Sequence, residues 1–232
     1  MAFNLSGTIN VFKLIVNPSL CLPHHTVATF NDLPIPLSRA FASRSGAEKV
    51  DIRAVVLDKD NCFATKNTNE VFPAYEKRFA ELKNAYPGAR LLIVSNSAGT
   101  LSDPGGKEAD VLEQSTGVPV LRHCVKKPGC GQQIMDYFRS KPETQVTSPS
   151  QVAIVGDRLF TDMMLANMMG SYGCWIEKGV QEDRGIVCYS LVGSFWAILL
   201  ISCVQLTKVE KSLSSFLTRR GYVAPDPVSS FE

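Results

Sequence analysis

Two carboxylates spaced two residues apart, Asp58 and Asp60, directly follow an apolar run at residues 52–57 that contains one arginine. An apolar, β-branched run of this kind is typical of a buried parallel strand, whose carboxyl end is where α/β proteins place ligands. Both carboxylates point to the same side of an extended chain, and the following loop can bring them to one centre. Because two like charges held that close are unfavourable without a cation, the pair favours a divalent-metal site. The alternative interpretation is a structural strand that ends in acidic residues.

Strands alternate with helices along the rest of residues 50–180, which form the predicted core. Periodicity and turn residues predict strands at 90–94, 118–121, 152–155 and 172–176, and helices at 74–84, 107–116, 131–139 and 162–169. Pro73 suits the first turn of the first helix, and Thr161 is a candidate N-cap for the last. This alternation predicts an α/β fold with a doubly wound parallel sheet.

Further polar residues fall at or just after the carboxyl ends of successive predicted strands. They are Ser95 with Asn96, then Lys127, then Asp157 with Asp162. Any one of these positions alone is weak evidence of function. Because the carboxyl ends of parallel strands meet at one edge of a sheet, their order favours a single site shared with Asp58 and Asp60.

Composition limits the class of protein. At 232 residues the chain is long enough to bury a full core, and one domain with tails is the default interpretation. A net charge of +2 with dispersed basic residues argues against nucleic-acid binding. Seven cysteines without a Cys-x-x-Cys pair, together with only three histidines, favour a reducing compartment and argue against a zinc site.

Residues 1–49 form an N-terminal segment before the predicted core. Apolar residues recur at roughly helical spacing between residues 3 and 16, and Asn17-Pro18 is expected to end this short amphipathic stretch. The stretch is too short and interrupted to span a bilayer, and it lacks the features of a secretory signal or an arginine-rich transit peptide. Two interpretations stay open: contact with a membrane interface, or packing against the domain.

The polar clusters resemble the four motifs of the haloacid-dehalogenase superfamily of aspartate-nucleophile phosphatases. They match as Asp58-Lys59-Asp60-Asn61-Cys62, then Ser95, then Lys127, then residues 156–162. The resemblance implies that Asp58 attacks phosphorus to form an aspartyl-phosphate, and that Asp60 protonates the leaving oxygen and later activates water. It also implies that Ser95, Asn96 and Lys127 bind the phosphoryl group.

The same resemblance implies Mg²⁺ as a cofactor. The ligands would be Asp58, Asp157 and the backbone carbonyl of Asp60, whereas Asp162 would lie outside the direct ligands. Asn61-Cys62 depart from the superfamily pattern, in which a threonine is usual at this point. Lys126 is a rival for Lys127, which is preferred because it directly precedes a proline.

The intervals between the motifs are too short for a large cap domain, so the site is expected to be open and to suit a substrate whose bulk stays outside. A closer resemblance, over about residues 5–180, is to the fungal mitochondrial phosphatidylglycerophosphatase family. It is carried by motif segments and by non-catalytic ones, among them 31–36 (NDLPIP), 118–130 (VPVLRHCVKKPGC) and 155–173 (VGDRLFTDMMLANMMGSYG).

This closer resemblance implies hydrolysis of phosphatidylglycerophosphate to phosphatidylglycerol, a precursor of cardiolipin, at the matrix face of the mitochondrial inner membrane. The implied partner is an anionic phospholipid at a membrane surface, and His123, Lys126 and Arg158 are expected either to meet its headgroup or to be solvated loop residues. Alternatives are a phosphatase that acts on a protein or another macromolecule, and a catalytically silent binding module. The presence of both Asp58 and Asp60 argues against the silent module.

Residues 181–232 form a C-terminal tail that contains an anomalous apolar segment, residues 186–206. This uncharged stretch is long enough for a transmembrane helix, and it interrupts the family pattern before an amphipathic stretch at residues 209–217. Three interpretations stay open: a translated intron, a membrane helix or a buried core helix. If the insertion disrupts folding, the chain is an inactive splice form despite its motifs.

Overall fold

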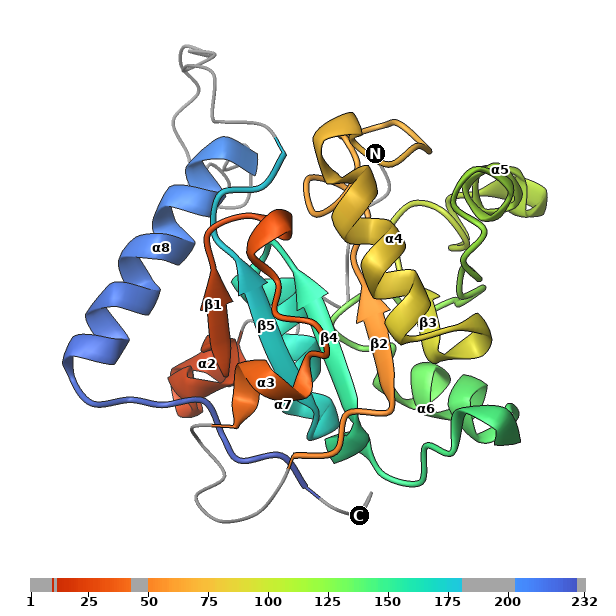
Figure 1. The fold of residues 1–232 in the computed structure, drawn as a ribbon. Helices are drawn as coiled ribbons and strands as arrows, with labels where there is room; N and C mark the ends of the chain where they lie inside the picture. Colours follow the sequence, from red (N-terminus) through yellow and green to blue (C-terminus); the bar gives the residue numbers. More distant parts are fainter. Residues whose placement is uncertain (1–9, 11, 43–49, 181–202, 229–232) are drawn as a thin grey trace, which may run out of the picture.

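A five-stranded parallel sheet forms the centre of the protein in the computed structural model, which describes residues 10, 12–42, 50–180 and 203–228 (Figure 1). The strands lie in the order β1-β5-β4-β2-β3. Their bounds are His25–Val27 for β1, Ala54–Leu57 for β2, Leu91–Ile93 for β3, Val152–Gly156 for β4 and Tyr172–Ile176 for β5. All neighbouring strands run parallel, so the predicted α/β fold is confirmed.

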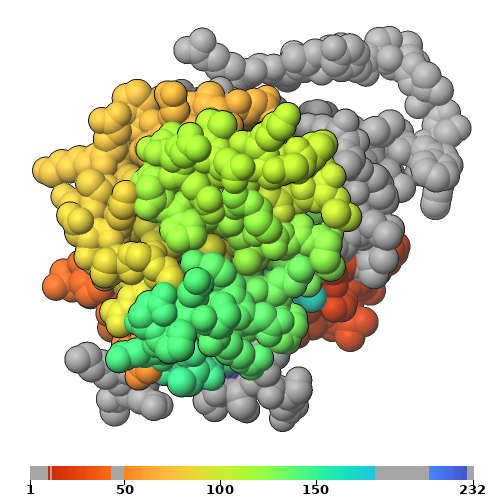
Figure 2. Space-filling model, turned by 90° about the vertical axis from the view of Figure 1, so that its right-hand side faces the viewer, coloured from red at the N-terminus to blue at the C-terminus, as the bar shows by residue number. Residues whose placement is uncertain are grey.

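Helices cover both faces of the sheet. They are α3 (Ser38–Phe41), α4 (Glu76–Ala85), α5 (Lys107–Thr116), α6 (Gly131–Arg139) and α7 (Met164–Met169). Val55 and Leu57 of β2 share a buried cluster with side chains of α3, α4 and α5, whereas Ala54 and Val56 share one with α6 and α7. Figure 2 views the molecule from the right-hand side of Figure 1, where α4, α5 and α6 form the visible surface in yellow to green. Residues 50–180 are described without a gap and include no separate cap domain, as expected.

Two predicted elements differ in the structure. The stretch at 118–121 makes only an isolated bridge between Ile93 and Val120, because Pro119 has no N–H to continue a ladder. The helix predicted at 162–169 begins earlier, with a π-helical turn at Leu159–Met163 that continues into α7. Arg158 stands at the N-cap position and Thr161 lies inside the turn, so the prediction of Thr161 as the N-cap is wrong.

The N-terminal residues add a strand that the sequence analysis did not predict. β1 pairs with β5 in the register His25 to Cys174, and its three residues are too few and too polar to form an apolar run. Residues that follow β1 are buried on the face of α4: Phe30, Leu33, Leu37 and Phe41. The described part of the N-terminal segment therefore packs against the core from β1 onwards.

A short helix precedes β1. α2 (Lys13–Val16) ends before Asn17 and Pro18, where the sequence predicts an end. Three apolar side chains around it are exposed: Phe12, Ile15 and Val16. Contact of this helix with a membrane interface stays a prediction.

The C-terminal helix α8 (Cys203–Arg219) lies beside β1, at the opposite edge of the sheet from β3 (Figure 1). Leu217 packs with Leu159, Met163 and Trp175 in a third apolar cluster, which agrees with the amphipathic character expected for residues 209–217. Most of the apolar segment at 186–206 lies outside the described residues, so its three interpretations stay open. Among the helices that the structure describes, none is long and apolar enough to cross a membrane.

Candidate active site

A buried ion-pair network lies at the carboxyl ends of β2 and β4. Asp58 directly follows β2, and its carboxylate contacts the Nζ atom of Lys127. The same Nζ atom lies 2.7 Å from Oδ1 of Asp162. Because the Lys127 side chain is only 2 % exposed, these charges interact with little screening by water. Lys127, the preferred candidate over Lys126, is therefore the lysine that contacts Asp58.

Asp157 completes a cluster of three carboxylates. Its Oδ2 atom accepts a hydrogen bond of 2.8 Å from Nδ2 of Asn61, while its Oδ1 atom is buried without a hydrogen-bond partner in the described part of the chain. One carboxylate oxygen from each of Asp58, Asp157 and Asp162 lies within 4.8 Å of the other two. Gly156 permits this approach, since a Cβ atom there would lie 2.4 Å from the carboxyl carbon of Asp162.

The negative charge of this cluster exceeds the positive charge beside it. Burial raises the pKa of Asp58 to about 6, although Lys127 lowers it. Burial, together with the charges of Asp58 and Asp162, raises the pKa of Asp157 to about 8. One lysine thus faces three carboxylates, one of which has a buried oxygen without a partner. Oxygen ligands with surplus negative charge fit a hard divalent cation such as Mg²⁺.

Asp60 lies outside this carboxylate cluster. Its Oδ1 atom is 3.0 Å from Nζ of Lys59 and accepts a hydrogen bond of 3.1 Å from the backbone N–H of Asn67. Its Oδ2 atom accepts a hydrogen bond of 3.4 Å from Oγ of Ser97. The structure therefore brings Asp162, rather than the Asp60 side chain, together with Asp58 and Asp157. A backbone-carbonyl contact from Asp60 to a metal stays a prediction.

The turn after β3 is tied to the same network. Oγ of Ser95 accepts a hydrogen bond of 3.1 Å from the N–H of Ser97 and lies 3.0 Å from the Ser97 hydroxyl. Oδ1 of Asn96 accepts a hydrogen bond of 2.8 Å from the backbone N–H of Lys127. Ser97 thus links Ser95 to Asp60, and Asn96 positions the lysine that contacts Asp58.

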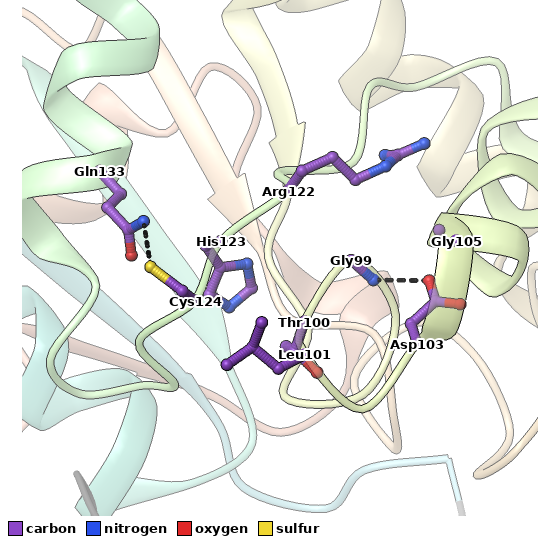
Figure 3. A pocket seen from close by; sticks show the side chains of 10 residues that line it. Gly99, Thr100, Leu101, Asp103, Gly105, Arg122, His123, Cys124 and Gln133 are labelled. Carbon is purple, nitrogen blue, oxygen red and sulfur yellow. Dashed lines mark hydrogen bonds between the residues drawn. The ribbon is translucent and has the colours of Figure 1, made fainter.

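A pocket of about 490 Å³ lies between the loop at 99–106, which follows Ser97 in the sequence, and residues 122–124 (Figure 3). His123 lines it but is buried, and its Nδ1–H donates to the carbonyl of Leu121 at 3.0 Å. Burial lowers the pKa of His123, so the ring is neutral near pH 7. Because the ring is buried, His123 is not the solvated loop residue that the sequence suggested as one alternative, and its contact with a headgroup stays a prediction.

Asp103 holds the loop of this pocket in place. Its carboxylate accepts three backbone hydrogen bonds of 2.9–3.0 Å, from the N–H groups of Gly99, Glu108 and Ala109. Burial alone would raise the pKa of Asp103, but these bonds outweigh it and lower the pKa. We expect Asp103→Ala to lower the free energy of unfolding by about 2–3 kcal/mol, because buried N–H groups lose their partner. Urea unfolding followed by circular dichroism measures this loss.

The control for this variant is Asp110→Ala on the adjacent helix α5. Asp110 is more than half exposed and makes an ion pair of 2.6 Å with Arg122. Exposed pairs of this kind contribute less than about 1 kcal/mol. Equal losses in the two variants would contradict the role given to Asp103. Because a lowered pKa stabilises the ionised form, the difference between the variants should shrink as the pH falls below about 4.

The comparison with known protein families decides the assignment. The model of a family described as "Mitochondrial PGP phosphatase" matches residues 5–181, which include Asp58, Lys127 and the carboxylate cluster. The chain belongs to this family. It is therefore a phosphoric monoester hydrolase of the α/β class.

Individual relatives of this phosphatase agree with the family. The mitochondrial phosphatidylglycerophosphatase of Saccharomyces cerevisiae is 46% identical over 215 residues, which cover 92% of this chain and 98% of that protein. A Schizosaccharomyces pombe protein named "Probable phosphatidylglycerophosphatase, mitochondrial" is 38% identical over 188 residues (81% and 88% of the two chains). The chloroplastic phosphatidylglycerophosphate phosphatase 1 of Chlamydomonas reinhardtii is 32% identical over 231 residues (98% and 80%). No solved structure matches the chain.

Two residues at the site of this phosphatase were not among the predicted site residues. Asn61, which holds Asp157, has a left-handed backbone with φ 63°, and an asparagine directly after the acidic pair was a signal because asparagine tolerates this conformation. Glu210 of α8 lies outside the stretch that the family model matches, yet its Oε1 accepts a hydrogen bond of 3.0 Å from the N–H of Phe160. No sequence pattern connects Glu210 to the turn after Asp157.

Proposed function

We propose that this phosphatase hydrolyses phosphatidylglycerophosphate to phosphatidylglycerol and inorganic phosphate, with Mg²⁺ and through an aspartyl-phosphate on Asp58, as in the haloacid-dehalogenase superfamily. The observation that carries the chemistry is the contact of Asp58 with Lys127 beside two further buried carboxylates. The names of the relatives support the substrate. They give no support to the alternative of a protein or another macromolecule as substrate.

Asp58 acts as the nucleophile. Lys127 holds its Oδ1 atom and lowers the pKa that burial raises, which favours the ionised carboxylate. An oxygen of the carboxylate attacks phosphorus, and the bond from phosphorus to the headgroup glycerol oxygen breaks. The phosphoryl group is then bound covalently to Asp58.

Asp60 transfers the protons. Its side chain is 31 % exposed and lies outside the carboxylate cluster, where it can exchange protons with solvent. As an acid it protonates the glycerol oxygen, so that phosphatidylglycerol leaves as an alcohol. As a base it then takes a proton from water, which attacks phosphorus, releases phosphate and regenerates Asp58.

Ser95, Asn96 and Lys127 bind the phosphoryl oxygens. The Ser95 hydroxyl and the Asn96 amide can donate hydrogen bonds, and Lys127 adds a positive charge. Asn96 also accepts a hydrogen bond from the backbone N–H of Lys127, which positions this lysine. Asp162 keeps the lysine in place through its ion pair of 2.7 Å. Mg²⁺ held by Asp58, Asp157 and the carbonyl of Asp60 would neutralise charge on the phosphoryl oxygens.

We place the reaction at the matrix face of the mitochondrial inner membrane, within the formation of cardiolipin. The mitochondrial names of the fungal relatives support the organelle. The lack of a cap domain within residues 50–180 supports a substrate whose acyl chains remain in the membrane.

Phosphate release from phosphatidylglycerophosphate in mixed micelles tests the proposal. We expect release in the presence of Mg²⁺ and its loss when EDTA is added, with recovery when excess Mg²⁺ is restored. Hydrolysis of a small aryl phosphate without hydrolysis of the lipid would overturn the substrate while leaving the chemistry in place. Release that persists in EDTA would overturn the role of the metal.

A further inference from the structure

The C-terminal helix contributes a buried carboxylate to the surroundings of the active site. Glu210 lies on α8 and is 1 % exposed. Its Oε1 atom accepts a hydrogen bond of 3.0 Å from the backbone N–H of Phe160, and the neighbouring N–H of Leu159 helps to lower the pKa of the same carboxylate, which burial raises. Both amides belong to the first turn of the helix at Leu159–Met163 that follows Asp157.

This contact caps an N–H group of the turn for which the N-cap residue Arg158 provides no side-chain acceptor. The first N–H groups of a helix have no partner within the helix, and they favour a negative charge nearby. The side chain of Arg158, which stands at the N-cap position, caps no N–H group of the turn, and Asp162 accepts the N–H of Arg158 rather than those of Leu159 and Phe160. Glu210 accepts the N–H of Phe160 from a position fifty residues further along the chain.

The same turn carries the groups that face Asp58. Oδ2 of Asp162 accepts a hydrogen bond of 3.1 Å from the N–H of Arg158, and Oδ1 of Asp162 lies 2.7 Å from Nζ of Lys127. Asp157 lies two residues before this turn. A shift of the turn would therefore displace Asp157 and Asp162 together and would disturb the lysine that contacts Asp58.

We propose that Glu210 is a positioning residue of the active site, which fixes the turn at Leu159–Met163 so that Asp157 and Asp162 face Asp58. Helix α8 is thus part of the catalytic unit, although it lies outside residues 5–181 that the family model matches. The Mg²⁺ affinity used to test this inference rests on the proposed function, whereas the placement of the turn does not.

The contact of α8 with the turn has a polar part and an apolar part that can be removed separately. The apolar part is Leu217, which is 4 % exposed and packs in the cluster of Leu159, Met163 and Trp175. Trp175 in turn donates a hydrogen bond of 2.9 Å from Nε1 to the carbonyl of Asp157. Leu217→Ala therefore weakens the packing of α8 without removing the hydrogen bond from Phe160 to Glu210, and it is the matched control for Glu210→Ala.

The test compares Mg²⁺ affinity, measured by titration calorimetry without substrate, in the parent, Glu210→Ala, Glu210→Gln and Leu217→Ala. We expect Glu210→Ala to weaken Mg²⁺ binding about tenfold or more, the scale seen when a residue that orients a metal ligand is lost. Glu210→Gln keeps an oxygen that accepts the N–H of Phe160, so its affinity should stay within about threefold of the parent. Leu217→Ala should lower the melting temperature and leave Mg²⁺ affinity within about twofold.

Amide hydrogen exchange of residues 157–163 in the metal-free protein is the second measurement. Exchange should be faster in Glu210→Ala than in Leu217→Ala, because only the first variant loses the cap. Equal Mg²⁺ affinities and equal exchange in these two variants would overturn the proposal for Glu210 alone. A parent protein that binds no Mg²⁺ would instead overturn the metal in the proposed function, and the exchange result would still decide the role of Glu210.

If Glu210→Ala does not fold, Glu210→Met takes its place in both measurements, because methionine fills a similar volume but has no oxygen to accept the N–H of Phe160.

Discussion

Replacement of Asp58 by asparagine is expected to reduce phosphate release by about a thousandfold or more, because loss of a catalytic nucleophile has effects on this scale. The amide cannot attack phosphorus, while its shape matches the carboxylate. Lys127 keeps its ion pair of 2.7 Å with Asp162, so its charge stays compensated. Burial raises the pKa of Asp58 to about 6, which means that the ionised group is held at a cost that the neutral amide avoids. Asp58→Asn should therefore fold at least as stably as the parent while losing activity.

Two measurements separate this chemical loss from a structural one. Thermal unfolding of the metal-free proteins should give Asp58→Asn a melting temperature equal to or above that of the parent. Brief reaction with radiolabelled substrate followed by an acid quench should leave label bound to the parent and none on the variant. Substantial turnover by Asp58→Asn would rule out Asp58 as the nucleophile. A fall in the melting temperature of Asp58→Asn would contradict the argument that the buried Asp58 charge destabilises the folded protein.

Much of the arrangement at the candidate site could be predicted because its side chains directly follow buried strands. The apolar runs of β2 and β4 are apparent in the sequence, and parallel strands bring their carboxyl ends to one edge of the sheet. Asp58 and Asp157 are placed by this rule alone. Lys127 is not, because the stretch before it makes only one bridge to β3, and its position depends on the bond of Asn96 to its backbone N–H.

Contacts between segments far apart in sequence could not be predicted in the same way. β1 joins the sheet through three residues without an apolar pattern, since its pairing with β5 depends on an edge that the rest of the fold creates. Asp162 reaches the carboxylate cluster because the π-helical turn starts at Leu159 and because Gly156 leaves room for its side chain. Glu210 meets that turn only after α8 packs against the core. Tertiary packing determines each of these features, and the local sequence gives little information about them.

Replacement of Asp157 by asparagine is expected to stabilise the metal-free protein and to remove its response to Mg²⁺. Asp157 has a buried oxygen without a partner in the described structure, and its pKa is raised from 3.8 to about 8 by burial, Asp58 and Asp162. The folded state therefore holds a proton that the unfolded chain loses, and the free energy of unfolding of the metal-free parent should fall as the pH rises from about 4 to 8. The neutral amide should flatten this dependence and raise stability at pH 8 by about 1–3 kcal/mol, the scale of an uncompensated buried polar group.

Thermal unfolding with and without Mg²⁺ at pH 6 and pH 8 measures both effects. In the parent, Mg²⁺ should raise the melting temperature more at pH 8 than at pH 6, because at the lower pH a proton competes for Asp157. In Asp157→Asn, Mg²⁺ should leave the melting temperature nearly unchanged at either pH, and phosphate release should be lost despite the greater stability. The exposed residue Asp136 of α6 provides the control, since Asp136→Asn removes one negative charge that pairs with Arg139 at the surface and should behave as the parent does. A metal-free Asp157→Asn protein that is less stable than the parent at pH 8 would contradict this prediction. It would mean that the Asp157 carboxylate stabilises the fold, rather than destabilising it in order to bind the cation.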